Sequence, residues 1–212
     1  MSSPDLLFDG SASAALTVVL GHGAGATMDS PFMNAFAQGL AAQGLRVARF
    51  EFPYMAARRA DGRRRPPDRQ PRLLACWQEV IQALAPAPLV IGGKSLGGRM
   101  ASLIAADGDT RDDRVRALVC LGYPFHPPGK PERLRTEHLQ QGLKSPTLIV
   151  QGTRDALGTR AEVEGYGLPR AIRFHWAPDG DHSLVPRKAS GRTAERNWAE
   201  AIDAIATFLK EI

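Results

Sequence analysis

Three residues of this sequence have the side chains that act together in nucleophilic catalysis: Ser95, Asp155 and His182. Ser95 is the centre of a Gly-x-Ser-x-Gly pattern that spans Gly93–Gly97. A serine hydroxyl becomes a nucleophile when a histidine removes its proton and a carboxylate keeps that histidine in the required tautomer. The chain order serine, acid, histidine is the order expected when the serine lies at a turn from strand to helix. Acyl transfer to Ser95 is therefore the first hypothesis.

The elements around Ser95 support this hypothesis. The apolar run Leu89–Ile91 precedes the pattern and is typical of a parallel strand covered on both faces. Gly97–Ala106 reads as a helix that begins directly after the serine. Such a turn exposes the serine hydroxyl, and it needs the flanking glycines because a Cβ there would collide with the neighbouring strand or helix. The alternative of a phosphate-binding loop fails because that motif requires glycine where this chain has Pro88.

The other two residues follow strands as well. Asp155 comes shortly after an apolar run at 147–150, and His182 comes after a run at 172–176. Because the carboxyl ends of parallel strands meet at one edge of a sheet, we expect both side chains beside Ser95. Asp179 and Asp181 are alternative orienting acids because they lie close to His182 in the sequence.

A glycine-rich turn predicts the oxyanion hole. The segment Gly21–Ala26 follows the strand predicted at 16–20, and its small residues let backbone amides approach a substrate oxygen. We expect the amides of Ala24 and Leu96 to be the donors, with Gly23 and Gly25 as alternatives that also contact the substrate.

The same turn supports a rival hypothesis of dinucleotide binding. Gly21, Gly23 and Ala26 fit a relaxed form of the nucleotide fingerprint, and Glu51 ends the following strand. Against this, the next helix is predicted to start only near Pro31, with Ser30 as its cap, which is too far along to hold a pyrophosphate. We prefer the hydrolase because the rival explains none of the three catalytic candidates.

For the remaining histidines, the simplest interpretation is a structural or surface role. His175 falls inside a predicted strand and is expected to be structural, while His126 and His138 lie between strands and are expected on the surface. His22 lies in the glycine turn, where a hydrogen bond across the site and a purely structural role are both open.

The pattern of elements indicates one α/β domain over residues 1–212, with about six mainly parallel strands and helices on both faces. The six strands are predicted at 16–20, 45–52, 89–91, 117–121, 147–150 and 172–176. The segment 122–146 is too short for a multi-helix lid, so we expect an open cleft that accepts a small or protruding ester.

The net charge of +5 is local. Seven arginines and two aspartates lie between Arg58 and Arg72, in a predicted loop, and the other 20 basic residues balance the other 20 acidic residues. The candidate contacts for an acidic ester are Arg63, Arg64 and Arg65, and also Lys94, which directly precedes Ser95. The alternative, which we prefer, is a solvated surface loop or arginines that pair with acidic residues elsewhere in the chain. Nucleic-acid binding is disfavoured because no aromatic residues are interleaved with them.

Cys76 and Cys120 lie far apart in apolar contexts and are expected to be free, buried thiols. No apolar run approaches the roughly 20 residues of a transmembrane helix, and the first residues, Met1 to Asp5, lack the pattern of a signal peptide. We therefore expect a soluble cytoplasmic enzyme without a membrane partner. The proposed chemistry needs neither a metal nor an organic cofactor.

Several stretches resemble a known family. They are Gly-His-Gly-Ala-Gly at Gly21–Gly25, Phe-Pro-Tyr at Phe52–Tyr54, the basic stretch ending at Asp68, and Gly-Gly-Lys-Ser-Leu-Gly-Gly-Arg at Gly92–Arg99. Together they are similar to the small α/β-hydrolase-like family of testis-expressed hydrolase-like proteins, which includes a subunit of a histone-acetyltransferase complex and bacterial predicted hydrolases. Dienelactone hydrolases are more distantly similar and have a cysteine where this chain has Ser95. The resemblance implies the α/β-hydrolase fold and the triad, and it leaves open a scaffold protein with a relic triad.

Overall fold

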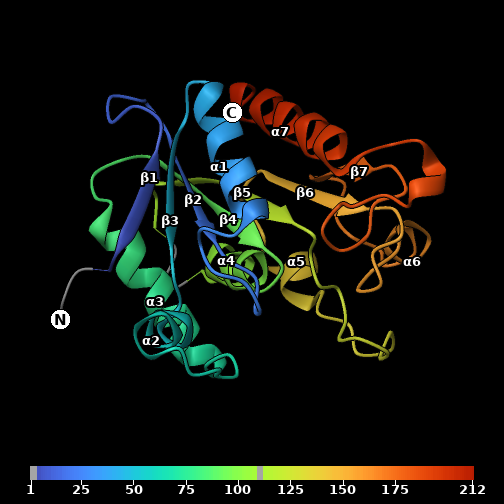
Figure 1. Ribbon diagram of the computed structural model, residues 1–212, viewed down its shortest axis with the longest axis horizontal. Helices are drawn as coiled ribbons and strands as arrows, with labels where there is room; N and C mark the ends of the chain where they lie inside the picture. The colour runs from blue at the N-terminus through green and yellow to red at the C-terminus, as the bar shows by residue number, and fades with distance from the viewer. Residues whose placement is uncertain (1–3, 109–111) are drawn as a thin grey trace.

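Residues 4–108 and 112–212 of the computed structural model are described, and within them seven strands form one sheet in the order β1-β3-β2-β4-β5-β6-β7 (Figure 1). The strands are β1 (Leu6–Asp9), β2 (Thr17–Gly21), β3 (Arg46–Phe50), β4 (Leu89–Lys94), β5 (Val115–Leu121), β6 (Thr147–Gly152) and β7 (Ile172–Ala177). Strands β2 to β7 are parallel, which confirms the six predicted strands, and β1 pairs antiparallel with β3 at the edge. Part of the segment used to argue against a signal peptide, residues 1–3, lies outside the described residues.

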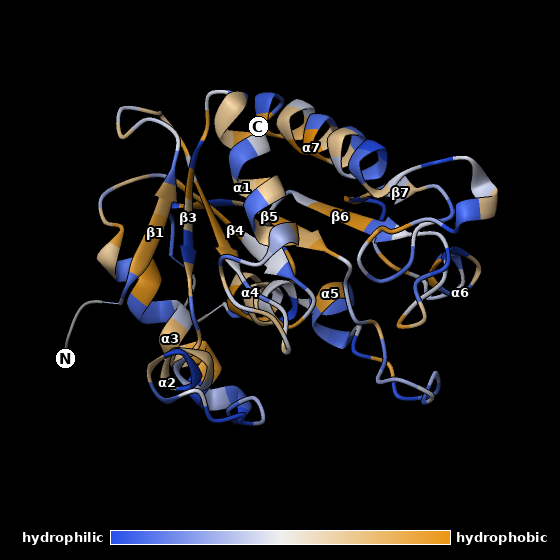
Figure 2. Ribbon diagram, viewed as in Figure 1, coloured by the Kyte–Doolittle hydropathy of each residue, from blue (hydrophilic) through white to orange (hydrophobic). Residues whose placement is uncertain are grey.

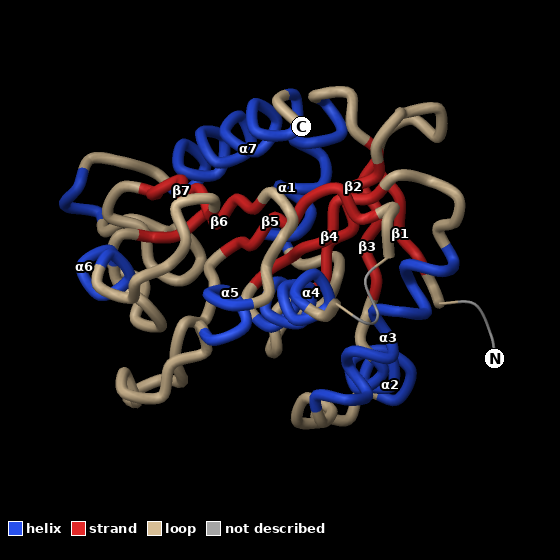
Figure 3. The backbone as a smooth tube through the Cα atoms, turned by 180° about the vertical axis from the view of Figure 1, so that it is seen from behind, coloured by secondary structure: helices blue, strands red, loops and turns tan. Residues whose placement is uncertain are grey.

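Helices cover both faces of this sheet (Figures 1 and 3). On one face lie α1 and α7, and on the other lie α3, α4 and α5. The helices are α1 (Pro31–Ala42), α2 (Pro53–Asp61), α3 (Gln70–Ala83), α4 (Leu96–Ala106), α5 (Glu137–Gln141), α6 (Arg160–Glu164) and α7 (Ala194–Lys210), with a short 3-10 turn at Lys188–Ser190. No helix in the described part of the chain is long and apolar enough to cross a membrane.

The core consists of two layers because alternate residues of a strand point to opposite faces. Val19 and Ile91 belong to the layer beneath α3 and α4, whereas Val18 and Val90 belong to the layer beneath α1 and α7. Most residues of the central strands are accordingly apolar, and the helices alternate apolar and polar stripes (Figure 2). Continuous apolar runs at 89–91 and 117–121 were therefore reliable signals of central strands.

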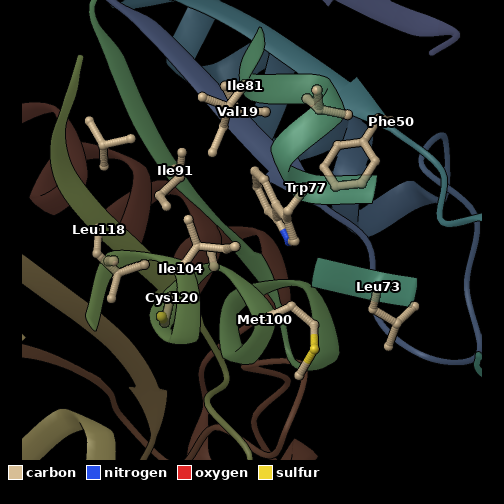
Figure 4. Packing of buried hydrophobic residues seen from close by; sticks show 14 of the residues in the cluster. Val19, Phe50, Leu73, Trp77, Ile81, Ile91, Met100, Ile104, Leu118 and Cys120 are labelled. Atoms are coloured by element: carbon tan, nitrogen blue, oxygen red, sulfur yellow. The ribbon is translucent and has the colours of Figure 1, made fainter. Parts of the chain in front are cut away.

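Trp77 shows how α3 is anchored. Its side chain is fully buried and meets the ring of Phe50 edge to face, with ring centroids 4.7 Å apart. Figure 4 shows Trp77 between Phe50 and the α4 side chains Met100 and Ile104. Burial of a large aromatic ring at this position joins α3, β3 and α4 into one packed unit. This packing holds α4 in place, and with it Ser95 at the N-cap of the helix.

The sheet order brings the two predicted site turns together. Strand β2 lies between β3 and β4, so the connection from β3 to β4 passes over β2. In open parallel sheets, ligands bind at the carboxyl ends of strands on either side of such a change of direction. The turn at the end of β2 and the turn at the end of β4 are therefore neighbours.

Three local expectations were wrong. The basic segment is not simply a loop, since α2 covers Pro53–Asp61 and places Arg58 in a helix. The strand β1 was not predicted, because it has only four residues and they are partly exposed or exposed. Ser30 occupies the N-cap position of α1, but its side chain makes no capping hydrogen bond.

Candidate active site

Ser95 lies at a strained turn between β4 and α4. Its φ of 50° falls in the left-handed region, which side chains other than glycine rarely adopt. A Cβ on Gly93 or on Gly97 would each lie 2.1 Å from the carbonyl oxygen of Gly21 in β2. The prediction that these two positions require glycine is thus confirmed. The strain holds the serine hydroxyl at the carboxyl edge of the sheet.

Ser95, His182 and Asp155 form a continuous hydrogen-bonded chain. The Nε2 atom of His182 lies 2.9 Å from the Ser95 hydroxyl oxygen, and its Nδ1 atom lies 2.7 Å from Oδ2 of Asp155. Because a carboxylate only accepts hydrogen bonds, Nδ1 carries the proton and Nε2 accepts the serine hydroxyl. The structure therefore brings together the three residues expected from their order in the sequence.

Asp155 is fully buried and surrounded by donors. Its Oδ2 accepts hydrogen bonds from His182 and from the Nε2 atom of Gln151 (2.9 Å), and its Oδ1 accepts the amide of Leu157 (2.9 Å). Gln151, also fully buried, further exchanges hydrogen bonds with the backbone of Tyr123. Sequence reasoning missed Gln151, although a polar residue at the end of an apolar strand was a usable signal. Gln151 fixes the carboxylate that orients the histidine.

The two alternative acids, Asp179 and Asp181, stabilise the loop that carries His182. Asp181 accepts the amides of Ser183 and Val185, and Asp179 pairs with Arg154 and Arg187. These interactions leave Asp155 as the carboxylate on the imidazole. The Arg187 guanidinium beside Asp179 also lowers the pKa of that carboxyl to about 2.

The α7 helix supports the same loop with two polar side chains. Asn197 is fully buried and donates to the carbonyl oxygens of Pro178 (3.1 Å) and Leu184 (2.8 Å). Trp198 donates from its indole nitrogen to the carbonyl of Ser183 (3.0 Å). Both side chains thus hold the histidine loop against α7.

The amides predicted for the oxyanion hole are available. Among the described residues, neither the Ala24 amide nor the Leu96 amide donates to another protein group. The carbonyl of Ala24 instead accepts the hydroxyl of Tyr54 at 3.0 Å. A pair of free amides beside a nucleophile is the arrangement that stabilises a tetrahedral oxyanion.

His22 has the structural role that was one of its two open interpretations. Its Nε2 accepts the amide of Phe52 (3.1 Å), so Nδ1 carries a proton and donates to the carbonyl of Gly23 (2.7 Å). Its own carbonyl accepts the amide of Gly97. Burial lowers the pKa of His22, which favours the neutral form that this pattern needs. His22 thus ties the glycine turn to β3 and to the start of α4.

Lys94 does not project toward a substrate, contrary to the expectation from sequence. Its side chain is buried against Phe32, and its ammonium group donates to the backbone carbonyl of His182. Burial lowers the pKa of Lys94 to about 8, although Asp155 and Asp181 act in the opposite direction. The lysine therefore supports the histidine loop from within the protein.

The basic segment has two parts: Arg58 and Arg59 line a hollow together with Gly25 and Ala26 of the glycine turn, whereas Arg63 to Arg65 lie further along the chain. Tyr54 at the start of α2 reaches Ala24, but Arg63 to Arg65 follow the far end of that helix, about 13 Å further along its axis. Arg63 and Arg64 are exposed, and Arg65 pairs with Asp61 in the same segment. These positions agree with the alternative of a solvated surface segment.

Three further expectations can be compared with the structure. His126 is buried and His138 is half-buried, so neither is the surface residue that we expected. His175 lies in β7 as predicted, and both cysteines are free and buried. No cluster of three or more potential metal ligands occurs within residues 4–108 and 112–212.

The dinucleotide hypothesis has lost its structural basis. The helix after the glycine turn starts at Pro31, five residues beyond Ala26, and so does not open at the turn. Glu51 is not free for a ribose, because its carboxylate pairs with Arg59 and accepts the amide of Met28.

Residues 14–210 match a single family, the alpha/beta hydrolase domain. The chain belongs to the alpha/beta hydrolase family. Its fold is also that of several solved structures. A serine hydrolase homologue from Coxiella burnetii aligns with a TM-score of 0.70 at 17% identity, over 95% of this chain and 89% of that one.

Two other members of the fold show the same likeness. A dienelactone hydrolase from Anabaena variabilis aligns with a TM-score of 0.68 at 20% identity, over 97% of this chain and 91% of that one. A serine hydrolase without a lid from Xanthomonas campestris aligns with a TM-score of 0.66 at 19% identity, over 98% and 88% of the two chains. At these identities the likeness establishes the fold, and this alpha/beta hydrolase must be interpreted from its own site.

Proposed function

We propose that this alpha/beta hydrolase is a serine esterase that cleaves small carboxylic esters through an acyl-Ser95 intermediate. The observation that carries the proposal is the unbroken chain of hydrogen bonds from the Ser95 hydroxyl through His182 to the buried Asp155. A relic site would have no reason to keep both distances below 3 Å, a buried acid and two free amides.

The mechanism follows from these contacts. His182 removes the proton of Ser95 as its oxygen attacks the ester carbonyl, and the amides of Ala24 and Leu96 stabilise the oxyanion. His182 then protonates the leaving alcohol, which leaves an acyl group on Ser95. A water molecule activated by His182 hydrolyses this ester and restores the serine. Throughout, Asp155 stabilises the imidazolium and keeps Nδ1 protonated.

The surroundings of Ser95 favour an accessible ester. The segment 122–146, where larger enzymes of this fold insert a lid, contains one helix of five residues, α5. Ser95 and Leu96 remain partly exposed. We therefore propose a short or protruding acyl group as the substrate, in line with the resemblance to small hydrolase-like proteins rather than to lipases.

A series of p-nitrophenyl esters tests this proposal. We expect acetate and butyrate esters to be hydrolysed and Ser95→Ala to lose at least 10³-fold in kcat/KM. The exposed Ser13→Ala serves as the matched control and should retain full activity. Equal hydrolysis by Ser95→Ala and the unmodified protein, both shown to be folded by circular dichroism, would contradict the proposal.

A further inference from the structure

A hollow of about 520 Å³ lies along α4, the helix that begins at Ser95. It is on the face of the sheet where α4 and α5 lie side by side (Figures 1 and 3). Its walls combine the cationic Arg99 and Arg135, the imidazole of His138 and the apolar Leu103, Ala106 and Leu134. This volume is in the range of sites that hold small organic ligands. None of these residues takes part in the proposed esterase mechanism.

The two arginines of this hollow lack carboxylate partners. Neither Arg99 nor Arg135 forms an ion pair with any described residue, whereas the half-buried Arg65 and the exposed Arg72 do. The Arg99 guanidinium has a long contact to Gln70 (3.3 Å), and its Nε atom is buried without a partner. Two half-buried cations side by side repel one another. Burial and the charge of Arg99 accordingly lower the pKa of Arg135.

A buried network fixes the spacing of the two arginines. The Ser102 hydroxyl donates to the carbonyl of Arg99 (2.8 Å), and the Tyr123 hydroxyl donates to the carbonyl of Arg135 (3.1 Å). Nε2 of His138 lies 2.8 Å from the hydroxyl oxygen of Ser102 and 3.2 Å from the hydroxyl oxygen of Tyr123.

Since both hydroxyl protons are already used, His138 donates from Nε2. Burial and then the charge of Arg99 lower the pKa of His138 to about 4, so its imidazole is neutral. The floor of the hollow is therefore a rigid polar frame that ties the backbones of Arg99 and Arg135 together.

We propose that this hollow binds a small organic anion. Its carboxylate or phosphate would lie on the Arg99 and Arg135 guanidinium groups, which suit planar oxyanions. Its apolar body would cover Leu134, a side chain that is 45% exposed, together with Leu103. Glu137 also lines the hollow, but no ion pair among the described residues joins it to either arginine, so a net positive charge remains there for a ligand.

Calorimetric titration with 4-ethylbenzoate tests the proposal, because this probe joins a carboxylate to an apolar body. We expect Arg99→Gln and Arg135→Gln each to raise its Kd at least tenfold. Arg133→Gln is the matched control, since Arg133 is exposed, near in sequence and outside the hollow. The neutral isostere 4-ethylbenzamide should bind at least tenfold more weakly than the benzoate. Inorganic phosphate, titrated alone, shows whether the cationic pair also accepts a phosphate.

The outcomes separate this site from a general attraction of anions to a basic protein. Equal affinity of 4-ethylbenzoate for all variants, or an equal loss in Arg133→Gln, would overturn the proposal. Arg99 lies one turn from Ser95, so its substitution could disturb folding, and Arg135→Gln then decides the result, with thermal unfolding as the check. Binding is expected in Ser95→Ala as well. The anion site and the esterase proposal can therefore fail separately.

Discussion

Lys94 offers a quantitative test of how the candidate site is built. The residue is buried, with an exposed fraction of 8%, and its ammonium group donates to the carbonyl of His182. Burial lowers its pKa from 10.5 to about 8. This difference of 2.5 units corresponds to about 3.4 kcal/mol by which the charged form destabilises the folded state. We consider the replacement Lys94→Met, which keeps the apolar stem and removes the charge.

The sign follows from proton binding. Below pH 8 the lysine is charged in both states, and the full cost is present. Between pH 8 and 10.5 the unfolded chain binds more protons than the folded protein, so the stability of the unmodified protein rises with pH. From pH 7 to pH 10 this recovers about 2.5 kcal/mol. Lys94→Met lacks this term because methionine does not titrate.

Urea unfolding at pH 7 and pH 10 measures the effect. The free energy of unfolding of the unmodified protein should rise by about 2.5 kcal/mol relative to that of Lys94→Met over this interval. Other titrating groups are common to both proteins and cancel in the comparison. Lys130→Met, at an exposed position, should show no comparable change. A difference between the two proteins that stays constant with pH would refute the buried position of the ammonium group.

Three further substitutions test the site. Asp155→Asn should lower kcat/KM by at least about 10³-fold in an ester assay. In either orientation, the NH2 group of the asparagine would face an N–H donor that bonds to the carboxylate in the unmodified protein. Gln151→Leu removes one of those donors and should lower kcat about tenfold while KM, measured in the same assay, stays constant. Gly97→Ala should lower the free energy of unfolding by about 3 kcal/mol or more, since its Cβ would lie 2.1 Å from the Gly21 carbonyl, whereas Gly108→Ala, which has open space, should change it little on chemical denaturation.

Much of the fold could be predicted because its signals are local and strong. The central strands are buried on both faces, so runs such as Leu89–Ile91 are wholly apolar. The helix α1 starts at Pro31 as expected, since proline fixes the first turn. In contrast, β1 is stabilised by pairing with β3, and α2 buries little beyond Tyr54 and Met55. Their formation depends on tertiary contacts that a short window of sequence does not contain.

The candidate site likewise contains residues that could be predicted from the sequence and residues that could not. Ser95, Asp155 and His182 each follow a strand, and a parallel sheet gathers such positions at one edge. Lys94 was misassigned because its partner, the carbonyl of His182, lies 88 residues further along the chain. The polar Gln151 at the end of an apolar strand was a local signal, but its contacts to the backbone of Tyr123 depend on the pairing of distant strands. Side chains that support a catalytic group from behind need a structure to be found.

The central claim is that Ser95 is an activated nucleophile, and labelling with a fluorophosphonate tests it most directly. The reagent forms a covalent bond only with a serine whose proton a neighbouring base removes. We expect one adduct on the intact protein, located at Ser95 by mass spectrometry and absent from Ser95→Ala and strongly reduced in His182→Ala. A folded protein that stays unlabelled, or one labelled equally in Ser95→Ala, would contradict the account.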